Sequence, residues 1–215
     1  MTRGLFITFE GGEGSGKTTQ SKLAEEYLRL KGHDVYLTKE PGGDEISEKI
    51  RSILLNPDHK GKLEDRTELL LFCAARANFV PRVVRPALDA GKIVLCDRYE
   101  DSTRTYQGFG RGLYLSDIDF INNFATQSLK PDLTLLFDVS AKLGLSKATT
   151  DEFGTKDRME SAGEEFHKKV NAGFLKLAEE EPYRMKVIQY VHNGQNVMQD
   201  KVREILNAAL LKHPR

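Results

Sequence analysis

The stretch Phe9-Glu10-Gly11-Gly12-Glu13-Gly14-Ser15-Gly16-Lys17-Thr18-Thr19 decides the fold of this chain. It fits the pattern G-x-x-x-x-G-K-[ST], the phosphate-binding loop (P-loop) that joins a buried strand to a helix. Residues 5–9 form a short apolar run before the loop, and residues 21–31 carry apolar side chains at helical spacing after it. Glycines let backbone N–H groups turn inward, and the helix adds its positive dipole end. This context disfavours an ordinary glycine turn and predicts a site for a nucleoside triphosphate.

Strand and helix patterns alternate along the rest of the chain. We expect further strands at residues 34–38, 92–96, 132–137 and 186–190, and helices at 45–55, 65–90 and about 197–211. Such alternation favours an α/β fold in which crossover helices join parallel strands, with the functional residues in the loops after the strands. The length of 215 residues and the hydrophobic content of 39% predict one domain over residues 1–215.

The composition excludes several partners. Lysine plus arginine equals aspartate plus glutamate, 32 against 32, so no global field favours nucleic acid or a membrane surface. No apolar run approaches the length of a membrane span, and the first strand follows Met1 too closely for a signal peptide. We therefore expect a cytoplasmic protein. Cys73 and Cys96 lie among apolar neighbours, which indicates two buried, reduced thiols rather than a disulfide or a nucleophile.

Two aspartates follow apolar runs and are candidates for a magnesium ligand. Asp97 comes after residues 93–96, at the carboxyl end of a predicted strand, where a carboxylate holds Mg²⁺ directly or through water. Arg98 is next to it and could clamp an acceptor phosphate or pair with Asp97. Asp138 follows another apolar run but ranks second, because a carboxylate there could instead cap a helix.

Two segments contain residue types that suit a nucleobase and a sugar. Phe72 and Arg76 are four residues apart, so they share one face of a predicted helix. A ring that stacks beside a guanidinium that donates to a carbonyl suits a base; a core phenylalanine and a surface arginine are the alternative. Residues 102–112 are rich in hydrogen-bonding side chains, which could read a base and a sugar or form a polar surface loop.

A polar segment at about residues 147–160 contains Lys147, Lys156 and Arg158. This composition suits a small lid insertion that brings cations over bound phosphates, and it also suits a solvated insertion. The sequence does not decide between the two.

Together these motifs resemble the thymidylate kinase family of P-loop nucleoside monophosphate kinases, and the likeness runs through nearly the whole chain. The matching motifs, in the family's order, are the P-loop, Glu40-Pro41-Gly42-Gly43, Phe72 with Arg76, Asp97-Arg98-Tyr99 and Tyr106-Gln107-Gly108. The resemblance implies a five-stranded parallel sheet flanked by helices. It also implies transfer of the γ-phosphoryl group of ATP to dTMP, giving dTDP, with Mg²⁺ and usually in a homodimer.

The resemblance also implies the site residues, position by position. ATP would be bound by Gly11, Gly12, Glu13, Gly14, Ser15, Gly16, Lys17, Thr18 and Thr19. The dTMP site would comprise Glu40, Pro41, Arg51, Phe72, Arg76, Arg98, Thr103, Tyr106 and Gln107. Mg²⁺ would be held by Thr18 and Asp97, and the catalytic residues would be Lys17, Arg98, Glu13 and Arg158.

Within the dTMP site, each implied residue has a role. Arg51 and Arg98 would hold the acceptor phosphate, with Glu13 near the phosphate and sugar. Phe72 would stack on thymine and Arg76 would donate to its O4, while Thr103 and Gln107 would face its N3 edge. Tyr106 would pack where a ribose 2′-hydroxyl would lie, which favours deoxyribose.

The P-loop contains no arginine, so the chain resembles the bacterial type, whose catalytic cations lie in the lid. Lys147, Lys156 and Arg158 are the candidates for that cation. Two other functions stay open at this point. A kinase for dCMP, UMP or AMP would share the loop and differ in the base site. A P-loop switch such as a GTPase would need an N-K-x-D element for guanine, which the sequence lacks.

Overall fold

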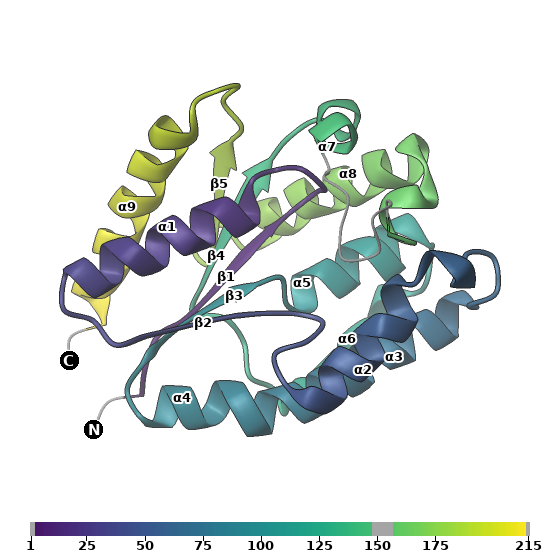
Figure 1. Cartoon of the computed structure of the whole chain (residues 1–215), viewed down its shortest axis with the longest axis horizontal. Helices are drawn as coiled ribbons and strands as arrows, with labels where there is room; N and C mark the ends of the chain where they lie inside the picture. Colours follow the sequence, from purple (N-terminus) through teal and green to yellow (C-terminus); the bar gives the residue numbers. More distant parts are fainter. Residues whose placement is uncertain (1–2, 148–156, 214–215) are drawn as a thin grey trace.

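The computed structural model describes residues 3–147 and 157–213, which form a central parallel sheet flanked by helices (Figure 1). The sheet has five strands in the order β2-β3-β1-β4-β5, and every neighbouring pair is parallel. The strands are β1 (Phe6–Gly11), β2 (Val35–Lys39), β3 (Ile93–Asp97), β4 (Leu133–Asp138) and β5 (Met185–Gln189). This arrangement confirms the predicted fold class.

The helices follow the predicted alternation. The α-helices are α1 (Lys17–Leu30), α2 (Glu45–Leu55), α3 (Asp65–Phe79), α4 (Arg85–Asp89), α5 (Glu100–Thr103), α6 (Leu115–Thr126), α7 (Ala141–Lys147), α8 (Glu164–Glu180) and α9 (Gln195–Lys212). Two π-helical segments are η2 (Val80–Val84) and η3 (Arg104–Gly110), and two short 3₁₀ segments are η1 (Pro57–His59) and η4 (Glu160–Ala162). No helix within these ranges is long and apolar enough to cross a membrane.

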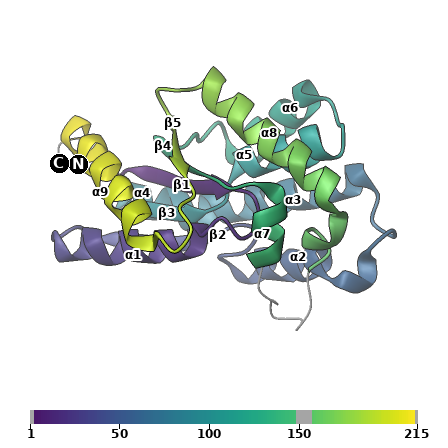
Figure 2. The ribbon, with the colours of Figure 1, turned by 90° about the horizontal axis from the view of Figure 1, so that it is seen from above.

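Helices cover both faces of the sheet because its strands are apolar on both sides. Ile7 and Phe9 of β1 pack in one core cluster with residues of α1 and α9, whereas Phe6 packs in a second cluster with Val84 and Leu88. Helix α8 packs on β4 and β5, and Figure 2 shows it on the opposite side of the sheet from α1 and α9. Burial on two faces explains why the strands read as continuous apolar runs.

The strands β2, β3 and β4 end one residue later than their sequence patterns predict. Parallel pairing continues to Lys39↔Asp97 between β2 and β3, and to Asp138↔Gln189 between β4 and β5. Backbone pairing does not depend on the polarity of the side chain, so a charged residue can close an apolar strand. Because all neighbouring strands are parallel, the loops that follow them leave the same edge of the sheet.

Three predicted segments turn out as follows. The helical region 65–90 is divided into α3, η2 and α4, and the break falls beside Pro81, which cannot donate to a helical hydrogen bond. The suggestion that residues 102–112 form a polar surface loop is wrong, because most of this run is helical and its centre is buried. Most of the lid expected at 147–160, including Lys156, lies outside the described residues.

Candidate active site

A cleft of about 1050 Å³ lies at the carboxyl edge of the sheet, where the loops after the strands converge. Most of the predicted site residues line it: Glu13, Gly14, Ser15, Gly16, Lys17, Thr18, Thr19, Glu40, Pro41, Arg51, Phe72, Arg76, Asp97, Arg98, Thr103, Tyr106 and Gln107. The structure therefore brings together residues that are as far apart in sequence as the P-loop and η3. Gly11, Gly12 and Arg158 do not line the cleft.

The P-loop connects β1 to the N-terminus of α1, as the motif predicts. Gly16 caps this helix with a φ of 90°, a conformation that strains any residue with a Cβ. Gly14 also has a positive φ, and a Cβ there would lie 2.2 Å from the carbonyl oxygen of Gly144. Both positions therefore require glycine. The resulting turn lies at the N-terminus of α1, where backbone N–H groups and the helix dipole favour a bound anion.

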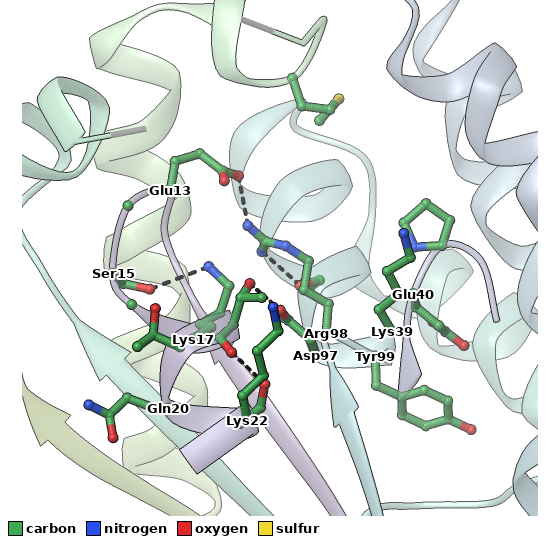
Figure 3. Close-up of a pocket in the computed structure, with 18 of the residues that line it drawn as sticks. Glu13, Ser15, Lys17, Gln20, Lys22, Lys39, Glu40, Asp97, Arg98 and Tyr99 are labelled. Carbon is green, nitrogen blue, oxygen red and sulfur yellow. Dashed lines mark hydrogen bonds and ion pairs between the residues drawn. The ribbon is translucent and has the colours of Figure 1, made fainter. Parts of the chain in front are cut away.

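Lys17 lies at the base of this loop with its ammonium group buried. Its Nζ donates to the carbonyl oxygen of Gly12 at 2.7 Å. It also donates to Ser15 Oγ at 3.3 Å, and Figure 3 shows this second contact. Burial, together with the positive charge of Arg98, lowers the pKa of Lys17 to about 8. An anion bound at the loop would offset both effects, so the site favours a phosphate over water.

Arg98 and Glu13 form the second charged pair of the cleft. Arg98 Nη2 donates to Glu13 Oε1 at 2.7 Å, and the Tyr106 hydroxyl donates to the same oxygen at 2.6 Å (Figure 3 shows the pair). Burial alone would raise the pKa of Glu13, but the charges of Arg98 and Lys17 outweigh it and lower that pKa to about 2. The carboxylate is therefore ionised and fixes the direction of the guanidinium.

Thr18 and Asp97 meet where α1 begins and β3 ends. Thr18 Oγ1 donates to Asp97 Oδ2 at 2.5 Å, although 79 residues separate them. A hydroxyl and a carboxylate oxygen next to a phosphate site are hard ligands of the kind that Mg²⁺ takes, usually with water and phosphate completing the shell. Asp138, the rival candidate, does not line the cleft. The geometry thus favours the Thr18–Asp97 pair.

Arg76 is 2% exposed and lines the cleft, so the alternative of a surface arginine is wrong. Its Nε donates to Glu40 Oε2 at 2.7 Å. Its Nη1 donates to Thr103 Oγ1 at 2.9 Å and to Asn122 Oδ1 at 2.7 Å. Burial raises the pKa of Glu40 to about 7 even though Arg76 opposes the shift. These contacts hold the guanidinium plane in one orientation beside Phe72, which also lines the cleft.

The two arginines expected at the acceptor phosphate have different surroundings. Arg98 has a positive φ of 71° and also donates from Nη1 to Gly11 O at 3.1 Å and to Ser102 Oγ at 3.2 Å. Arg51 lines the cleft from α2, and its Nη1 donates to the carbonyl oxygen of Pro41 at 3.0 Å. Both side chains are therefore held by backbone carbonyls at the same edge of the sheet.

The structure does not bring Arg158 to the cleft, contrary to its expected role as a catalytic cation. The side chain is 4% exposed, its Nε donates to Leu54 O at 2.7 Å, and Nη1 pairs with the buried carboxylate of Glu68. Because a buried arginine needs a partner that compensates its charge, the pairing with Glu68 explains how Arg158 can lie away from solvent. Lys147 does line the cleft, with its Nζ 5.2 Å from the centre of the Tyr190 ring.

Sequence reasoning missed three buried acidic or amide residues that organise the site. Glu10 accepts the Tyr99 backbone N–H at 2.7 Å and the Ser102 hydroxyl at 2.6 Å, so it ties the Arg98 loop to β1. Burial and the charge of Asp101 raise the pKa of Glu10 to about 8. Asn122 accepts a hydrogen bond from Arg76, and Glu68 accepts one from Gln107. An acid within the apolar strand before the P-loop was the only one of these signals visible in the sequence.

Comparisons with known proteins identify the family of the chain. The sequence model of the family described as Thymidylate kinase matches residues 9–201. The thymidylate kinase of Geotalea uraniireducens is 46% identical over 213 residues, which cover 97% of this chain and 98% of that protein. The thymidylate kinase of Halalkalibacterium halodurans is 45% identical, with 95% of this chain and 97% of the relative covered.

A solved structure gives the same result. The crystal structure of thymidylate kinase from Ehrlichia chaffeensis superposes with a TM-score of 0.75 at 36% sequence identity, and covers 95% of this chain and 99% of that one. Fold, cleft and sequence likeness therefore lead to one conclusion: the chain belongs to the thymidylate kinase family, which phosphorylates dTMP to dTDP with ATP as the phosphoryl donor.

Proposed function

We propose that this chain binds ATP and dTMP side by side in the cleft and that the residues described above align them for phosphoryl transfer. The observation that supports this most is the convergence of a phosphate loop, an oxygen pair suited to Mg²⁺, and two oriented arginines within one cavity. A binding module would not need the second arginine site, whereas a kinase must hold donor and acceptor together.

The donor half of the cleft would take the ATP phosphates. The P-loop N–H groups and Lys17 Nζ would bind the phosphate oxygens, in place of the contacts that Lys17 makes with Gly12 and Ser15. Thr18 and Asp97 would hold Mg²⁺, which when bound neutralises charge on the phosphates. Lys147, at the described edge of the lid segment, would add a cation on the donor side.

The acceptor half would take dTMP. Arg98 and Arg51 would hold its phosphate, and Glu13 would keep Arg98 pointed toward it. No strong base is required, because a phosphate oxygen is already an anion at neutral pH. The work of the protein is therefore to place two anions in line and to compensate their charge.

The base would be read by residues from α3, α5 and η3. Phe72 would stack on thymine and Arg76 would donate to its O4, with Thr103 and Gln107 at the N3 edge. Tyr106, whose hydroxyl is held by Glu13, would pack against the sugar and disfavour a 2′-hydroxyl.

A panel assay tests this proposal. Purified protein with ATP and Mg²⁺ is offered dTMP, dUMP, dCMP, UMP and AMP, and dTMP is expected to have the highest kcat/KM. Lys17→Ala is expected to abolish turnover and keep the fold, while Lys201→Ala, which alters an exposed lysine on α9, serves as the matched control. A preference for another monophosphate, or normal turnover by Lys17→Ala, would contradict the assignment.

Homodimerisation is a further part of the proposal. Phe120 and Phe124 of α6 are 75% and 80% exposed and are four residues apart on one helical face, and Leu70 of the adjoining α3 is 55% exposed. Phe124→Glu is expected to convert a dimer into a monomer in sedimentation velocity, and Leu211→Glu, at an exposed position on α9, is the control. A monomeric unmodified protein would contradict this part of the proposal.

We also propose a cytoplasmic location. Cys73 and Cys96 are free and buried, as expected for a reducing compartment.

A further inference from the structure

Glu68 is a buried acid that supports the cleft without lining it. It lies on α3, one helical turn before Phe72, and is 0% exposed. Its Oε1 accepts hydrogen bonds from Gln107 Nε2 at 2.8 Å and from Arg111 Nε at 3.2 Å. Its Oε2 accepts from Arg111 Nη2 at 3.0 Å and pairs with Arg158. One carboxylate thus links α3, the η3 region and the segment after the lid.

The charge state of Glu68 is well defined. Burial would raise the pKa of Glu68, but the hydrogen bond from Arg111, the charge of Arg158 and the hydrogen bond from Gln107 outweigh it, so that pKa lies below its usual range. An ionised carboxylate has oxygens that only accept hydrogen bonds. Any group that faces it must therefore be a donor.

This requirement fixes the orientation of the Gln107 side-chain amide. The amide can present its NH₂ group or its carbonyl oxygen in a given direction, and the NH₂ group must face Glu68. Gln107 is 1% exposed and lines the cleft. Within residues 3–147 and 157–213, Gln107 Oε1 accepts no hydrogen bond. The carbonyl oxygen is thus the polar atom of Gln107 that is left for a ligand.

We propose that Glu68 is a specificity-determining positioning residue, which holds the Gln107 carbonyl oxygen toward the cleft so that the site accepts a pyrimidine with an N3–H group and rejects cytosine. The inference rests on the proposed placement of Gln107 at the N3 edge of the base. Thymine and uracil carry a donor at N3, which satisfies the carbonyl oxygen. Cytosine carries an unprotonated acceptor at N3, so two acceptors would oppose each other.

Rotation of the amide would let Gln107 donate to cytosine, but its carbonyl oxygen would then face the Glu68 carboxylate. Glu68 prevents this rotation because the acceptor–acceptor contact would be buried and unsatisfied. Arg76, held by Glu40 and Asn122, opposes the cytosine amino group independently. Loss of the Glu68 contact is therefore expected to weaken the discrimination rather than remove it.

The test compares two substrate ratios in Glu68→Gln. A glutamine at this position can donate or accept, so it no longer fixes the Gln107 amide. The ratio of kcat/KM for dTMP to that for dCMP is expected to fall about tenfold or more, as when one buried hydrogen bond no longer discriminates. The dTMP-to-dUMP ratio is expected to stay constant, because both bases carry an N3–H. A purely structural defect would lower all three activities together.

Two further variants keep the test decisive if Glu68→Gln is unstable. Glu68→Asp keeps the charge that neutralises the arginines but is too short to hold Gln107, and the same fall in the dTMP-to-dCMP ratio is expected. Arg111→Met removes an ion pair and keeps the Glu68–Gln107 contact. This control is expected to lower the melting temperature without altering the ratio.

The double variant Glu68→Gln with Gln107→Ala shows which part of the proposal is wrong if the expected result is not found. If Glu68 acts through Gln107, Glu68→Gln changes the dTMP-to-dCMP ratio in the otherwise unmodified protein but not in a protein that already carries Gln107→Ala. An unchanged ratio in both Glu68 variants, with a changed ratio in Gln107→Ala, overturns the role of Glu68 alone. An unchanged ratio in Gln107→Ala overturns the base-reading role of Gln107 and the inference with it. Absence of dTMP phosphorylation by the unmodified protein would overturn the proposed function instead.

Discussion

Replacement of Arg76 with lysine keeps the positive charge and removes the planar guanidinium. The arginine contacts Glu40 through Nε and Nη2, and it contacts Thr103 and Asn122 through Nη1 on the other side. One ammonium group cannot reach partners on both sides. We expect the lysine to keep the ion pair with Glu40, because that partner is the charged one, and to lose the other two hydrogen bonds.

The magnitude follows from the buried partners that are left. An unsatisfied buried polar group costs about 1–3 kcal/mol, so the loss of two contacts is expected to lower the free energy of unfolding by about 2–6 kcal/mol. For a chain of this size, each kcal/mol corresponds to about 2–4 °C in melting temperature. Loss of the proposed charged hydrogen bond to thymine O4 costs about 1.5–3 kcal/mol, which is roughly a 10- to 150-fold rise in the Kd for dTMP.

Calorimetric titration of Arg76→Lys with dTMP and with ATP measures the two affinities separately, and thermal unfolding measures the stability. Arg82→Lys is the matched control, because Arg82 is exposed in the same helical region. An unchanged dTMP affinity, or an equal loss of ATP and dTMP affinity, would refute the role of Arg76 in reading the base. A melting temperature equal to that of the control would refute the stability argument.

Three shorter predictions concern other parts of the molecule. The kcat/KM for ATP is expected to fall as pH rises through about 8. Burial and the charge of Arg98 lower the pKa of Lys17 to about 8, and a neutral amine no longer attracts phosphate. A kcat/KM that stays constant up to about pH 9 would contradict this prediction. Arg184→Met leaves Asp101 buried without its two-point partner and is expected to lower the free energy of unfolding by about 3–5 kcal/mol in urea titrations. A loss below about 1 kcal/mol would show that the pair contributes little. Asp97→Asn is expected to raise the Mg²⁺ concentration for half-maximal turnover about 10- to 100-fold, and an unchanged requirement would exclude Asp97 from the metal site.

Local patterns were enough to predict the fold class and the P-loop. Strands buried on two faces give continuous apolar runs, and the positive φ at Gly16 explains a glycine before Lys17, so both signals are present in short stretches of sequence. Element boundaries were less accurate. Asp97 and Asp138 end their strands because backbone pairing with neighbouring strands continues past the apolar residues. The length of this pairing depends on both strands, so it cannot be predicted from one segment of the sequence.

The choice between the two aspartates shows where tertiary structure was needed. The sheet places β1 between β3 and β4, so the P-loop has a strand-end aspartate on either side. The sequence ranks Asp97 above Asp138 because Asp138 could cap a helix, but only the folded chain shows that Asp97 reaches Thr18. The reason is that side-chain direction at a strand end depends on contacts across the sheet.

The fate of the charged side chains was also decided only by the fold. A surface position was the alternative for Arg76 in the sequence, and Arg158 was expected in the lid. Both are buried against acids that lie 36 and 90 residues away, Glu40 and Glu68. A charge is buried only when a partner compensates it, and that partner is supplied by distant elements. The sequence by itself thus determined which chemistry the chain can carry, and the tertiary structure determined which of its charges face the cleft.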